Sequence, residues 1–193
     1  MMWGGFVKQN GVLIAVVGPS GVGKDSLLSG AQENLPSVQF MRRTITRPAN
    51  AGGESHKAVT EDEFLALRDQ QKFLFHWNAH GLLYGIPMYA MYLVQNGHTA
   101  VFNGSRHALA EQRERWPELK VIWVMADLEL RAERLARRGR ETLDDIRNRL
   151  AIADAEIPAD AIIVENNTTL KEGVMQIQDA IMQLDQDCRA VAI

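Results

Sequence analysis

The sequence has little that could build a disulfide framework, a zinc site or a membrane span. Cys188 is the one cysteine among 193 residues, so the chain cannot close an internal disulfide, which fits a reducing compartment. No grouping of histidine and cysteine has zinc spacing. The longest apolar runs, residues 12–17 and 121–126, are far shorter than the roughly 20 residues of a membrane helix, and no secretory leader is recognisable. We therefore expect a cytoplasmic protein with no membrane partner.

The sequence also lacks an excess of charge of either sign. Lysine and arginine total 21 against 24 acidic residues, a net charge of −3 with histidine neutral. Such a balance provides no overall field for nucleic acid, so any anion must be bound by a local cluster. Apolar residues make up 46% of the chain and charged residues 23%, which excludes a disordered protein.

Short apolar runs alternate with amphipathic segments along most of the chain. Residues 12–17 are apolar on both faces and rich in β-branched side chains, as a buried parallel strand requires. Similar runs occupy residues 99–102, 121–125 and 161–164. Capping boxes at residues 60–63 and 169–172 predict helix starts, and Asn96-Gly97 predicts the end of a helix that begins near Pro87. Alternating strands and helices predict a three-layer α/β fold with a parallel sheet.

Two segments interrupt this alternation. Residues 41–92 combine an arginine-rich strand, a glycine turn, a helix and a short strand at 73–76, which predicts an inserted subdomain. Residues 131–149 are densely basic. A length of 193 residues fits one domain with room for an insertion, since about 150 residues per domain is typical. We expect a single domain over 1–193 whose core comprises residues 1–40, 93–130 and 150–193.

The strongest motif is a phosphate-binding loop. It has the spacing G-x-x-x-x-G-K, follows the first strand directly and precedes a helical pattern. Glycines at these positions let successive backbone N–H groups point at phosphate oxygens beside a helix N-terminus, and the lysine adds a charge for the β- and γ-phosphates. The loop residues expected to bind ATP are Gly18, Pro19, Ser20, Gly21, Val22, Gly23 and Lys24.

One position departs from the full signature. The residue after the lysine is normally a serine or threonine whose hydroxyl binds Mg²⁺, but here it is Asp25, with Ser26 one place later. A carboxylate is a hard oxygen ligand that suits Mg²⁺, and so does the displaced hydroxyl. Both remain candidates for the metal and for nucleotide binding.

The remaining motifs, taken in order, resemble those of guanylate kinases. After the phosphate loop come Thr-Ile-Thr-Arg-Pro at 44–48, Gly-Glu at 53–54, an acidic helix start at 61–64, His-Trp at 76–77 and Tyr-Gly at 84–85. The family's lid motifs are matched at residues 134–142 and 146–150. The resemblance implies a guanylate kinase-like P-loop fold, with an acceptor-binding subdomain at 41–92 and a helical lid at 131–149 that closes over ATP.

The same resemblance assigns roles to basic side chains. It implies that Arg134 binds ATP, that Arg138 and Arg149 act with Lys24 on the transferring phosphoryl group, and that Arg47 acts on the acceptor. Each lid arginine could instead belong to a solvated helix face. That alternative is strongest for Arg131 and Arg137, which could pair with nearby glutamates.

The departures from guanylate kinases lie where those enzymes read the guanine edge. His76 replaces a glutamate, Ile86 replaces a small polar residue, and residues 102–105 contain no acid. A site without these partners rejects a purine, since an unpaired polar edge in an apolar wall costs about 1–3 kcal/mol. Arginine suits bidentate phosphate capture. We therefore expect a base-free, phosphate-rich acceptor, bound by Arg42, Arg43, Arg47, His56, Lys57, His76 and Tyr84.

The variant loop together with Thr-Ile-Thr-Arg-Pro and Leu-Tyr-Gly-Ile-Pro resembles the ribose 1,5-bisphosphate phosphokinases of bacterial phosphonate breakdown. This implies transfer from ATP to ribose 1,5-bisphosphate, giving 5-phosphoribosyl 1-diphosphate. A phosphate acceptor is already a dianion at pH 7 and needs no general base. The alternatives are a guanylate or other nucleoside monophosphate kinase, a non-catalytic guanylate kinase-like module, and a kinase of another small metabolite. The sequence leaves a monomer and a homodimer equally open.

Several residues have two interpretations. His76 either contacts the acceptor or is a partly buried strand residue, and Trp77 is most simply a packing residue. Asn166 and Asn167 either line an adenine pocket or cap a turn.

Overall fold

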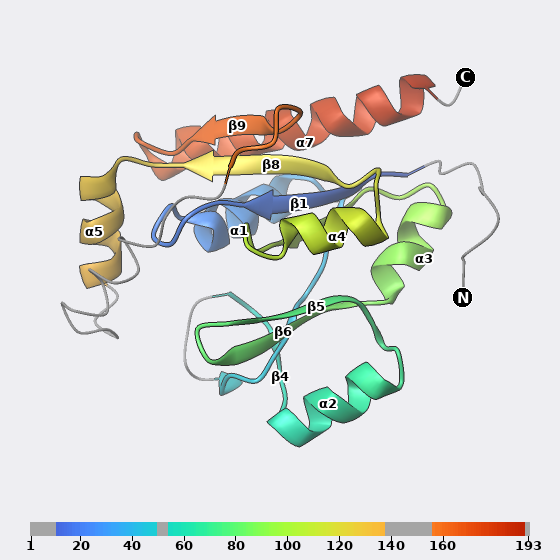
Figure 1. The fold of residues 1–193 in the computed structure, drawn as a ribbon. Coiled ribbons are helices and arrows are strands. Elements are labelled where there is room, and N and C mark those ends of the chain that lie inside the picture. The colour runs from blue at the N-terminus through green and yellow to red at the C-terminus, as the bar shows by residue number, and fades with distance from the viewer. Residues whose placement is uncertain (1–10, 50–53, 138–155, 192–193) are drawn as a thin grey trace.

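A five-stranded parallel sheet forms the centre of the molecule (Figure 1). The computed structural model describes residues 11–49, 54–137 and 156–191. The strand order is β2-β7-β1-β8-β9, and every pairing is parallel. The strands are β1 (Leu13–Val17), β2 (Gln39–Phe40), β7 (Ala100–Asn103), β8 (Lys120–Met125) and β9 (Ile162–Glu165). Because parallel strands end at the same edge, the loops after β1 and β7 lie side by side.

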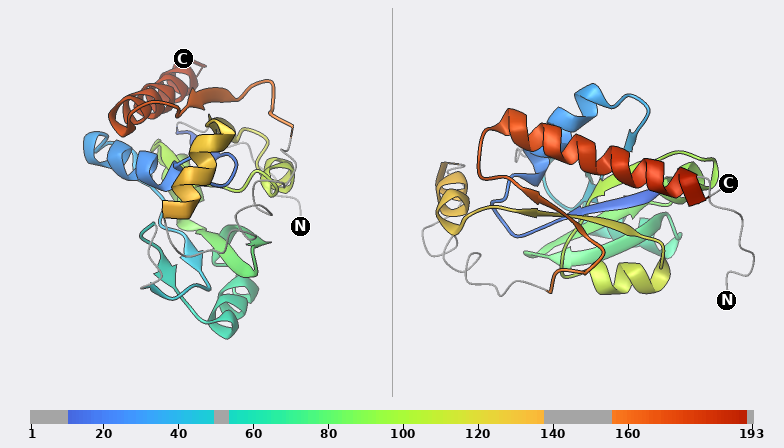
Figure 2. Two further views of the ribbon diagram at one scale, coloured as in Figure 1. Left: turned by 90° about the vertical axis from the view of Figure 1, so that its left-hand side faces the viewer. Right: turned by 90° about the horizontal axis from the view of Figure 1, so that it is seen from above.

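Helices cover both faces of this sheet, because successive side chains of a strand point to opposite faces. On one face Ile14 and Val16 pack with α1 (Lys24–Asn34) and α7 (Leu170–Val191). On the other face Ala15 and Val17 pack with α3 (Tyr89–Gln95) and α4 (Leu109–Arg115). Figure 2 shows α1 and α7 on the side opposite α4. The predicted three-layer α/β/α fold is confirmed.

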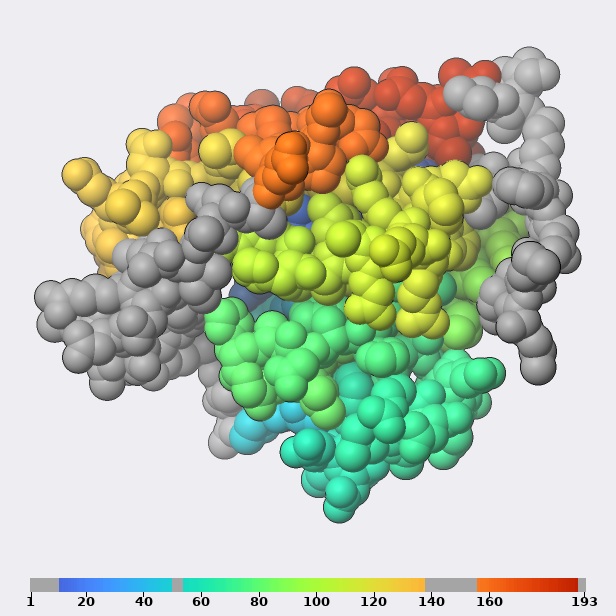
Figure 3. All heavy atoms as spheres, viewed as in Figure 1, coloured from blue at the N-terminus to red at the C-terminus, as the bar shows by residue number. Residues whose placement is uncertain are grey.

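A second, four-stranded sheet has the order β4-β3-β6-β5 and lies below the central sheet in the view of Figure 1. In the space-filling view of Figure 3 its residues (cyan to green) form the lower part of the molecule. It contains β3 (Thr44–Ile45), β4 (Lys57–Ala58), β5 (Phe73–Ala79) and β6 (Leu82–Pro87), and α2 (Glu61–Asp69) packs beside it. The two long strands are antiparallel and joined at His80-Gly81, whose φ angles of 53° and 71° make a tight turn. The expected short strand at residues 73–76 is therefore the first part of a longer hairpin.

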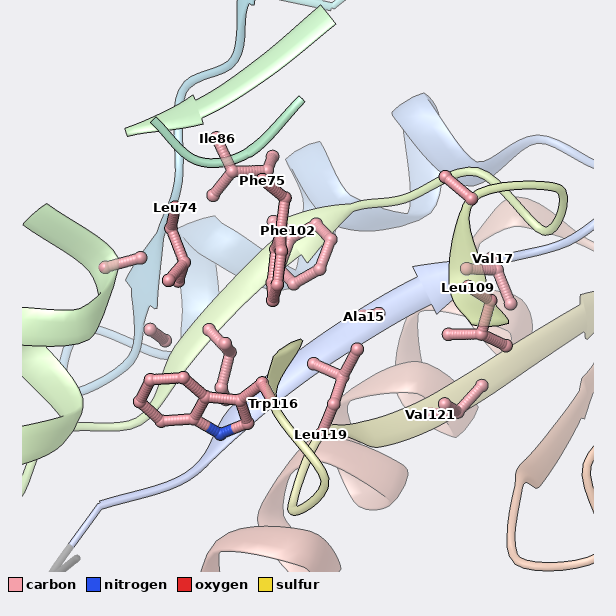
Figure 4. Close-up of a cluster of buried hydrophobic side chains, with 14 of the residues drawn as sticks. Ala15, Val17, Leu74, Phe75, Ile86, Phe102, Leu109, Trp116, Leu119 and Val121 are labelled. Carbon is pink, nitrogen blue, oxygen red and sulfur yellow. The ribbon is translucent and has the colours of Figure 1, made fainter. Parts of the chain in front are cut away.

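A shared apolar cluster ties this second sheet to the core (Figure 4). Phe75 of β5 packs 5.7 Å, centroid to centroid, from Phe102 of β7, and Ile86 of β6 lies in the same cluster with no exposed surface. The second sheet is thus positioned by burial against the core and does not rest on its chain connections alone.

The predicted helix signals are confirmed. Thr60 and Glu63 form a reciprocal capping box at the start of α2, and Thr169 and Glu172 make the same pair of contacts before α7. α3 ends at Gln95, directly before Asn96-Gly97. The basic segment begins as α5 (Leu128–Arg137); residues 138–155, with Arg138 and Arg149, lie outside the described residues. Across the described ranges, we find no helix with the length and apolar character needed to cross a bilayer.

Candidate active site

The phosphate-binding loop runs from the end of β1 to the start of α1 and requires its glycines. Gly18 has φ 149°, and a Cβ there would lie 2.2 Å from the carbonyl oxygen of Val124 on the neighbouring strand. Gly23 has φ 92°, and its Cβ would lie 2.7 Å from the amide nitrogen of Asn166. At Gly18 any side chain would collide with the backbone of the neighbouring strand, and at Gly23 it would collide with the buried Asn166 side chain in a backbone conformation that favours glycine. The loop therefore keeps a curled backbone at the N-terminus of an 11-residue helix, the geometry that binds phosphate.

Lys24 folds back over this loop. Its Nζ donates hydrogen bonds to the carbonyl oxygens of Gly18 at 2.8 Å and Pro19 at 3.3 Å. The ammonium group of Lys24 is thus held above the loop that would bind the phosphates. Phosphate oxygens can replace the two carbonyl oxygens as its hydrogen-bond partners, because a charged acceptor forms the stronger hydrogen bond.

Helix α5 and the loop between β9 and α7 both form hydrogen bonds to the phosphate loop. Arg134 of α5 donates to the carbonyl oxygens of Val22 at 3.3 Å and Asn166 at 2.9 Å. Asn166 is 3% exposed and donates to the same Val22 oxygen at 2.8 Å. Arg131 donates to the carbonyl oxygen of Ser20 at 3.0 Å. These contacts join α5 and the β9–α7 loop to the phosphate loop.

These contacts decide between the two interpretations that the sequence left open for Arg131 and Arg137. Arg131 is buried against the phosphate loop, so it is not part of a solvated helix face. Arg137 pairs with Glu133 at 2.7 Å on the surface, as the alternative interpretation proposed. Asn167 accepts a hydrogen bond from the backbone N–H of Asp127 and donates one to its carboxylate, so it joins the β9–α7 loop to the β8–α5 loop.

A cavity of about 190 Å³ lies between the phosphate loop and the second sheet. It opens beside a wider groove of about 730 Å³ along α1, and the two share Asp25, Glu54 and Asn103. Among the described residues, two carboxylates and four basic side chains line the cavity. The carboxylates are Asp25 and Glu54, and the basic side chains are Lys24, Arg43, Arg47 and Arg106. Such a balance favours an anionic ligand.

Arg43 is firmly held on one side of this cavity. It is 9% exposed, its Nε lies 3.0 Å from Glu54 Oε2, and its Nη2 bonds the other oxygen of the same carboxylate. Its guanidinium also lies 5.0 Å from the ring centre of Tyr84 and 6.0 Å from that of Trp77. The two rings stack at 5.5 Å with an angle of 4°. Cation–π attraction and the ion pair together fix the direction of Arg43.

Asn103, the last residue of β7, connects the two carboxylates. Its amide nitrogen donates to Asp25 at 2.7 Å and lies 3.4 Å from Glu54. The residue is 5% exposed, and its buried Oδ1 has no hydrogen-bond partner among the described residues. A buried acceptor without a partner is costly, so this oxygen favours a cation or a donor in the cavity.

These residues fit a magnesium ion that is held mainly through phosphates. Asp25 offers a half-buried carboxylate at the start of α1, Ser26 an exposed hydroxyl, and Asn103 an oxygen on the same side. No cluster of three or more histidine, cysteine or acidic side chains that could hold a metal occurs in the described ranges. Mg²⁺ binds in this way, through one or two carboxylates plus substrate phosphates.

The structure distributes the predicted acceptor residues over three places. Arg43, Arg47 and Tyr84 line the cavity. Arg42 lines the neighbouring groove and donates to the carbonyl oxygen of His56 at 2.7 Å. Lys57 is exposed on β4.

His56 differs from its expected place at the ligand. It is 4% exposed, with Nε2 3.0 Å from the carbonyl oxygen of Arg47 and Nδ1 3.3 Å from Arg47 Nη2. It does not line the cavity; it packs behind Arg47 and orients it.

His76 and Ile86 also lie elsewhere than expected. His76 lies on the opposite face of β5 from Trp77, because adjacent strand residues alternate. Its charged neighbours are Arg115, Glu111 and Arg68. Burial first, and then the charge of Arg115, lowers the pKa of His76. Ile86 belongs to the apolar cluster, so the argument from an apolar wall against a purine does not apply to it.

Sequence reasoning missed the residues that the β7–α4 loop and the hairpin supply to the cavity. They are Trp77, His80, Ser105, Arg106 and His107. A usable signal was present, because residues directly after a parallel strand next to the phosphate-loop strand lie at the ligand edge of the sheet.

Comparison with known proteins agrees with this geometry. Residues 14–154 match the AAA domain family. A crystal structure of guanylate kinase from Anaplasma phagocytophilum superposes with a TM-score of 0.65 at 18% identity, covering 93% of this chain and 89% of that one. The fold and site therefore define a P-loop kinase with the guanylate kinase architecture.

Relatives of higher identity narrow the class. A ribose 1,5-bisphosphate phosphokinase from a Ruegeria species is 43% identical over 179 residues, which cover 91% of this chain and 94% of that protein. A bifunctional ribose 1,5-bisphosphokinase-thymidine phosphorylase from Cupriavidus necator is 42% identical over 178 residues, 91% of this chain, but the match spans only 30% of that protein. The chain belongs to the ribose 1,5-bisphosphate phosphokinase family.

Proposed function

We propose that this protein transfers the γ-phosphoryl group of ATP to ribose 1,5-bisphosphate and produces ADP and 5-phosphoribosyl 1-diphosphate. The observation that carries the proposal is the cavity beside the phosphate loop, which is lined by Arg43, Arg47 and Arg106. The names of the relatives support the choice of sugar. The setting would be the cytoplasm, in the breakdown of organic phosphonates, with ATP and the phosphorylated sugar as the binding partners.

The chemistry asks for alignment and charge neutralisation. An oxygen of the 1-phosphate forms a bond to the γ-phosphorus, the bond from that phosphorus to the β–γ bridging oxygen breaks, and ADP leaves with the electron pair. The attacking phosphate is largely a dianion at pH 7, since its second pKa is about 6, so the site needs no general base. Bound Mg²⁺ would neutralise the β- and γ-oxygens.

The chain's own residues would hold the two reactants in line. The phosphate-loop N–H groups and Lys24 bind the β- and γ-phosphates, while Asp25 or Ser26 faces the metal. Arg43 and Arg47 grip the acceptor from the second sheet, so residues 41–92 act as the acceptor-binding subdomain. Arg134 anchors the nucleotide side. Residues 131–149 would close as a lid and bring Arg138 and Arg149 to the transferring group.

A base-free acceptor follows from the residues that line the cavity. Its two carboxylates, Asp25 and Glu54, already accept hydrogen bonds from Asn103 and Arg43, and Asp25 is also a candidate ligand of the metal. A base N–H pair would have to compete with these contacts, and a hydrogen bond to a charged group contributes about 1.5–3 kcal/mol.

The test is to identify the product. The enzyme is incubated with ATP, Mg²⁺ and ribose 1,5-bisphosphate, and phosphorus NMR should show a new diphosphate with the 5-phosphate unchanged. Lys24→Ala should lower turnover at least about a hundredfold, the effect of removing one transition-state donor, and Arg149→Ala should do the same. Lys171→Ala, an exposed substitution on α7, is the matched control. ADP release with GMP but not with the sugar would show a nucleoside monophosphate kinase, and no ATP binding would show a non-catalytic module.

A further inference from the structure

Glu54 places a carboxylate in a cavity that favours an anion. Its side chain is 14% exposed and lines both the cavity and the neighbouring groove. A carboxylate repels the phosphates of an acceptor in the same cavity, unless it also makes a contact that offsets this repulsion. The ion pair with Arg43 neutralises Glu54, but it also weakens the attraction of that arginine for phosphate. The position of Glu54 therefore points to a second contact, with an uncharged part of the acceptor.

The carboxylate of Glu54 can accept hydrogen bonds beyond those from Arg43. Nε of Arg43 lies 3.0 Å from Oε2, and Nη2 donates to Oε1, so each oxygen accepts one hydrogen bond from the guanidinium. An ionised carboxylate has about four lone-pair sites. Arg43 occupies the edge that could meet the two N–H groups of a base, whereas a single position on one oxygen is enough for a hydroxyl.

Asn103 supplies a donor directly beside this acceptor. Its amide nitrogen donates to Asp25 at 2.7 Å, and the same nitrogen lies 3.4 Å from Oε2 of Glu54. The second distance is longer than the roughly 2.7–3.2 Å of an ordinary N–H···O bond, so this contact is weak. A hydroxyl oxygen fits at about 2.8 Å from both atoms. It would accept a hydrogen bond from Asn103 and donate one to Glu54, and a hydroxyl group can do both.

The location of this pair selects one hydroxyl of the sugar. Asn103 is the last residue of β7, and its contact with Asp25 places the pair beside the start of α1, at the phosphate-loop end of the cavity. The reacting 1-phosphate must lie at this end, because the γ-phosphoryl group is bound by the phosphate loop. The hydroxyl on C2 is the one attached next to the carbon that bears this phosphate.

We infer that Glu54, together with Asn103, binds the 2-hydroxyl of the acceptor and so determines specificity for ribose over 2-deoxyribose. The inference rests on the proposed function, since it concerns the same acceptor. Arg43 and Arg47 hold phosphate, and Glu54 distinguishes the sugar that carries it.

The experiment measures kcat/KM for ribose 1,5-bisphosphate and for 2-deoxyribose 1,5-bisphosphate at saturating ATP and Mg²⁺. The wild type should prefer ribose by about 10- to 100-fold, the effect of one hydrogen bond to a charged group. In Glu54→Ala, kcat/KM falls for both sugars because Arg43 loses its partner, but the preference should shrink to less than about threefold. Glu54→Gln keeps an acceptor oxygen without the charge, so its preference should lie between those of the wild type and Glu54→Ala.

Two control variants separate loss of the hydroxyl contact from a general loss of activity. Arg47→Gln removes a cavity arginine whose Nη2 lies 3.3 Å from His56; it should lower kcat/KM for both sugars by the same factor and leave the preference unchanged. Glu114→Ala removes an exposed carboxylate on α4 and should change kcat/KM for neither sugar. For any variant too slow to assay, calorimetric dissociation constants of the two sugars give the same comparison.

The outcomes are distinct. A wild type that prefers ribose by less than about threefold would overturn the role of Glu54. A Glu54→Ala variant that keeps the wild-type preference would also overturn it, because Glu54 would then only orient Arg43. A wild type that turns over neither sugar would overturn the proposed function itself.

Discussion

Asn103 holds two carboxylates together with one amide, and its replacement by aspartate tests that arrangement. In the wild type the amide nitrogen donates to Asp25 at 2.7 Å and lies 3.4 Å from Glu54. Asn103→Asp keeps the shape of the side chain, removes the donor and adds a third negative charge at a position that is 5% exposed. The substitution therefore converts an attractive contact into a repulsive one without creating a cavity.

The expected cost has two parts. A hydrogen bond to a charged group contributes about 1.5–3 kcal/mol. Two like charges at this separation repel by about 4 kcal/mol at an effective dielectric of about 20, part of which is relieved when the carboxylates share a proton. We expect Asn103→Asp to lower the free energy of unfolding by about 3–5 kcal/mol at pH 8. Asn103→Leu, which removes the donor without adding charge, should cost only about 1–3 kcal/mol.

Urea unfolding of the wild type, Asn103→Asp and Asn103→Leu at pH 8 and pH 5.5 measures the lost hydrogen bond and the added charge repulsion separately. The Asn103→Asp variant should recover stability relative to the wild type at pH 5.5, because a shared proton removes the repulsion, and Mg²⁺ should stabilise it more than it stabilises the wild type. The Asn103→Leu variant should show neither effect. An Asn103→Asp variant within about 1 kcal/mol of the wild type at pH 8, with no response to acid, would refute the contact as the structure draws it.

Three other perturbations have definite signs. Burial, followed by the charge of Arg115, lowers the pKa of His76 below its usual 6.5, so the fold favours neutral imidazole and loses stability as pH falls below about 6.5. His76→Gln should flatten urea-unfolding stability between pH 7.5 and 5.5. Burial raises the pKa of Asp185, but hydrogen bonding, first from Arg189, lowers it overall; its contribution is therefore present above about pH 4 and lost in acid. Asp185→Asn should cost about 1–2 kcal/mol at pH 7, a difference from the wild type that unfolding curves at pH 3 should no longer show. Gly23→Ala forces a side chain into φ 92° and should lower stability by about 1–2 kcal/mol and weaken ATP binding, as thermal unfolding and calorimetry would show.

Local rules were enough to predict the parts of the molecule that depend on neighbouring residues. The phosphate loop, the buried strands and the capping boxes each lie within a few consecutive positions, where backbone geometry and hydrogen bonding decide the structure. The parallel sheet followed from the alternation of these elements.

The placement of side chains across the cavity depended on register, which the sequence does not show. A shift of one residue on β5 exchanges His76 for Trp77 on the cavity side, and this explains why the motif match selected the wrong one of the pair for the cavity wall. The sequence could not show that both ring nitrogens of His56 lie within hydrogen-bond distance of backbone carbonyl oxygens. These contacts form only when the segment between β3 and β4 folds, so in the sequence alone His56 resembles a ligand-binding histidine. Predicting that Asn103 and Arg106 line the cavity would have required knowing that β7 pairs with β1.

The central claim is that the cavity binds phosphates on a sugar and does not recognise a nucleobase. Its most direct measurement is kcat/KM for ribose 1,5-bisphosphate and for GMP with the same enzyme, ATP and Mg²⁺. We predict a preference for the sugar of at least about a thousandfold, because a base would leave buried polar groups unpaired. An equal or higher kcat/KM for GMP would contradict the account.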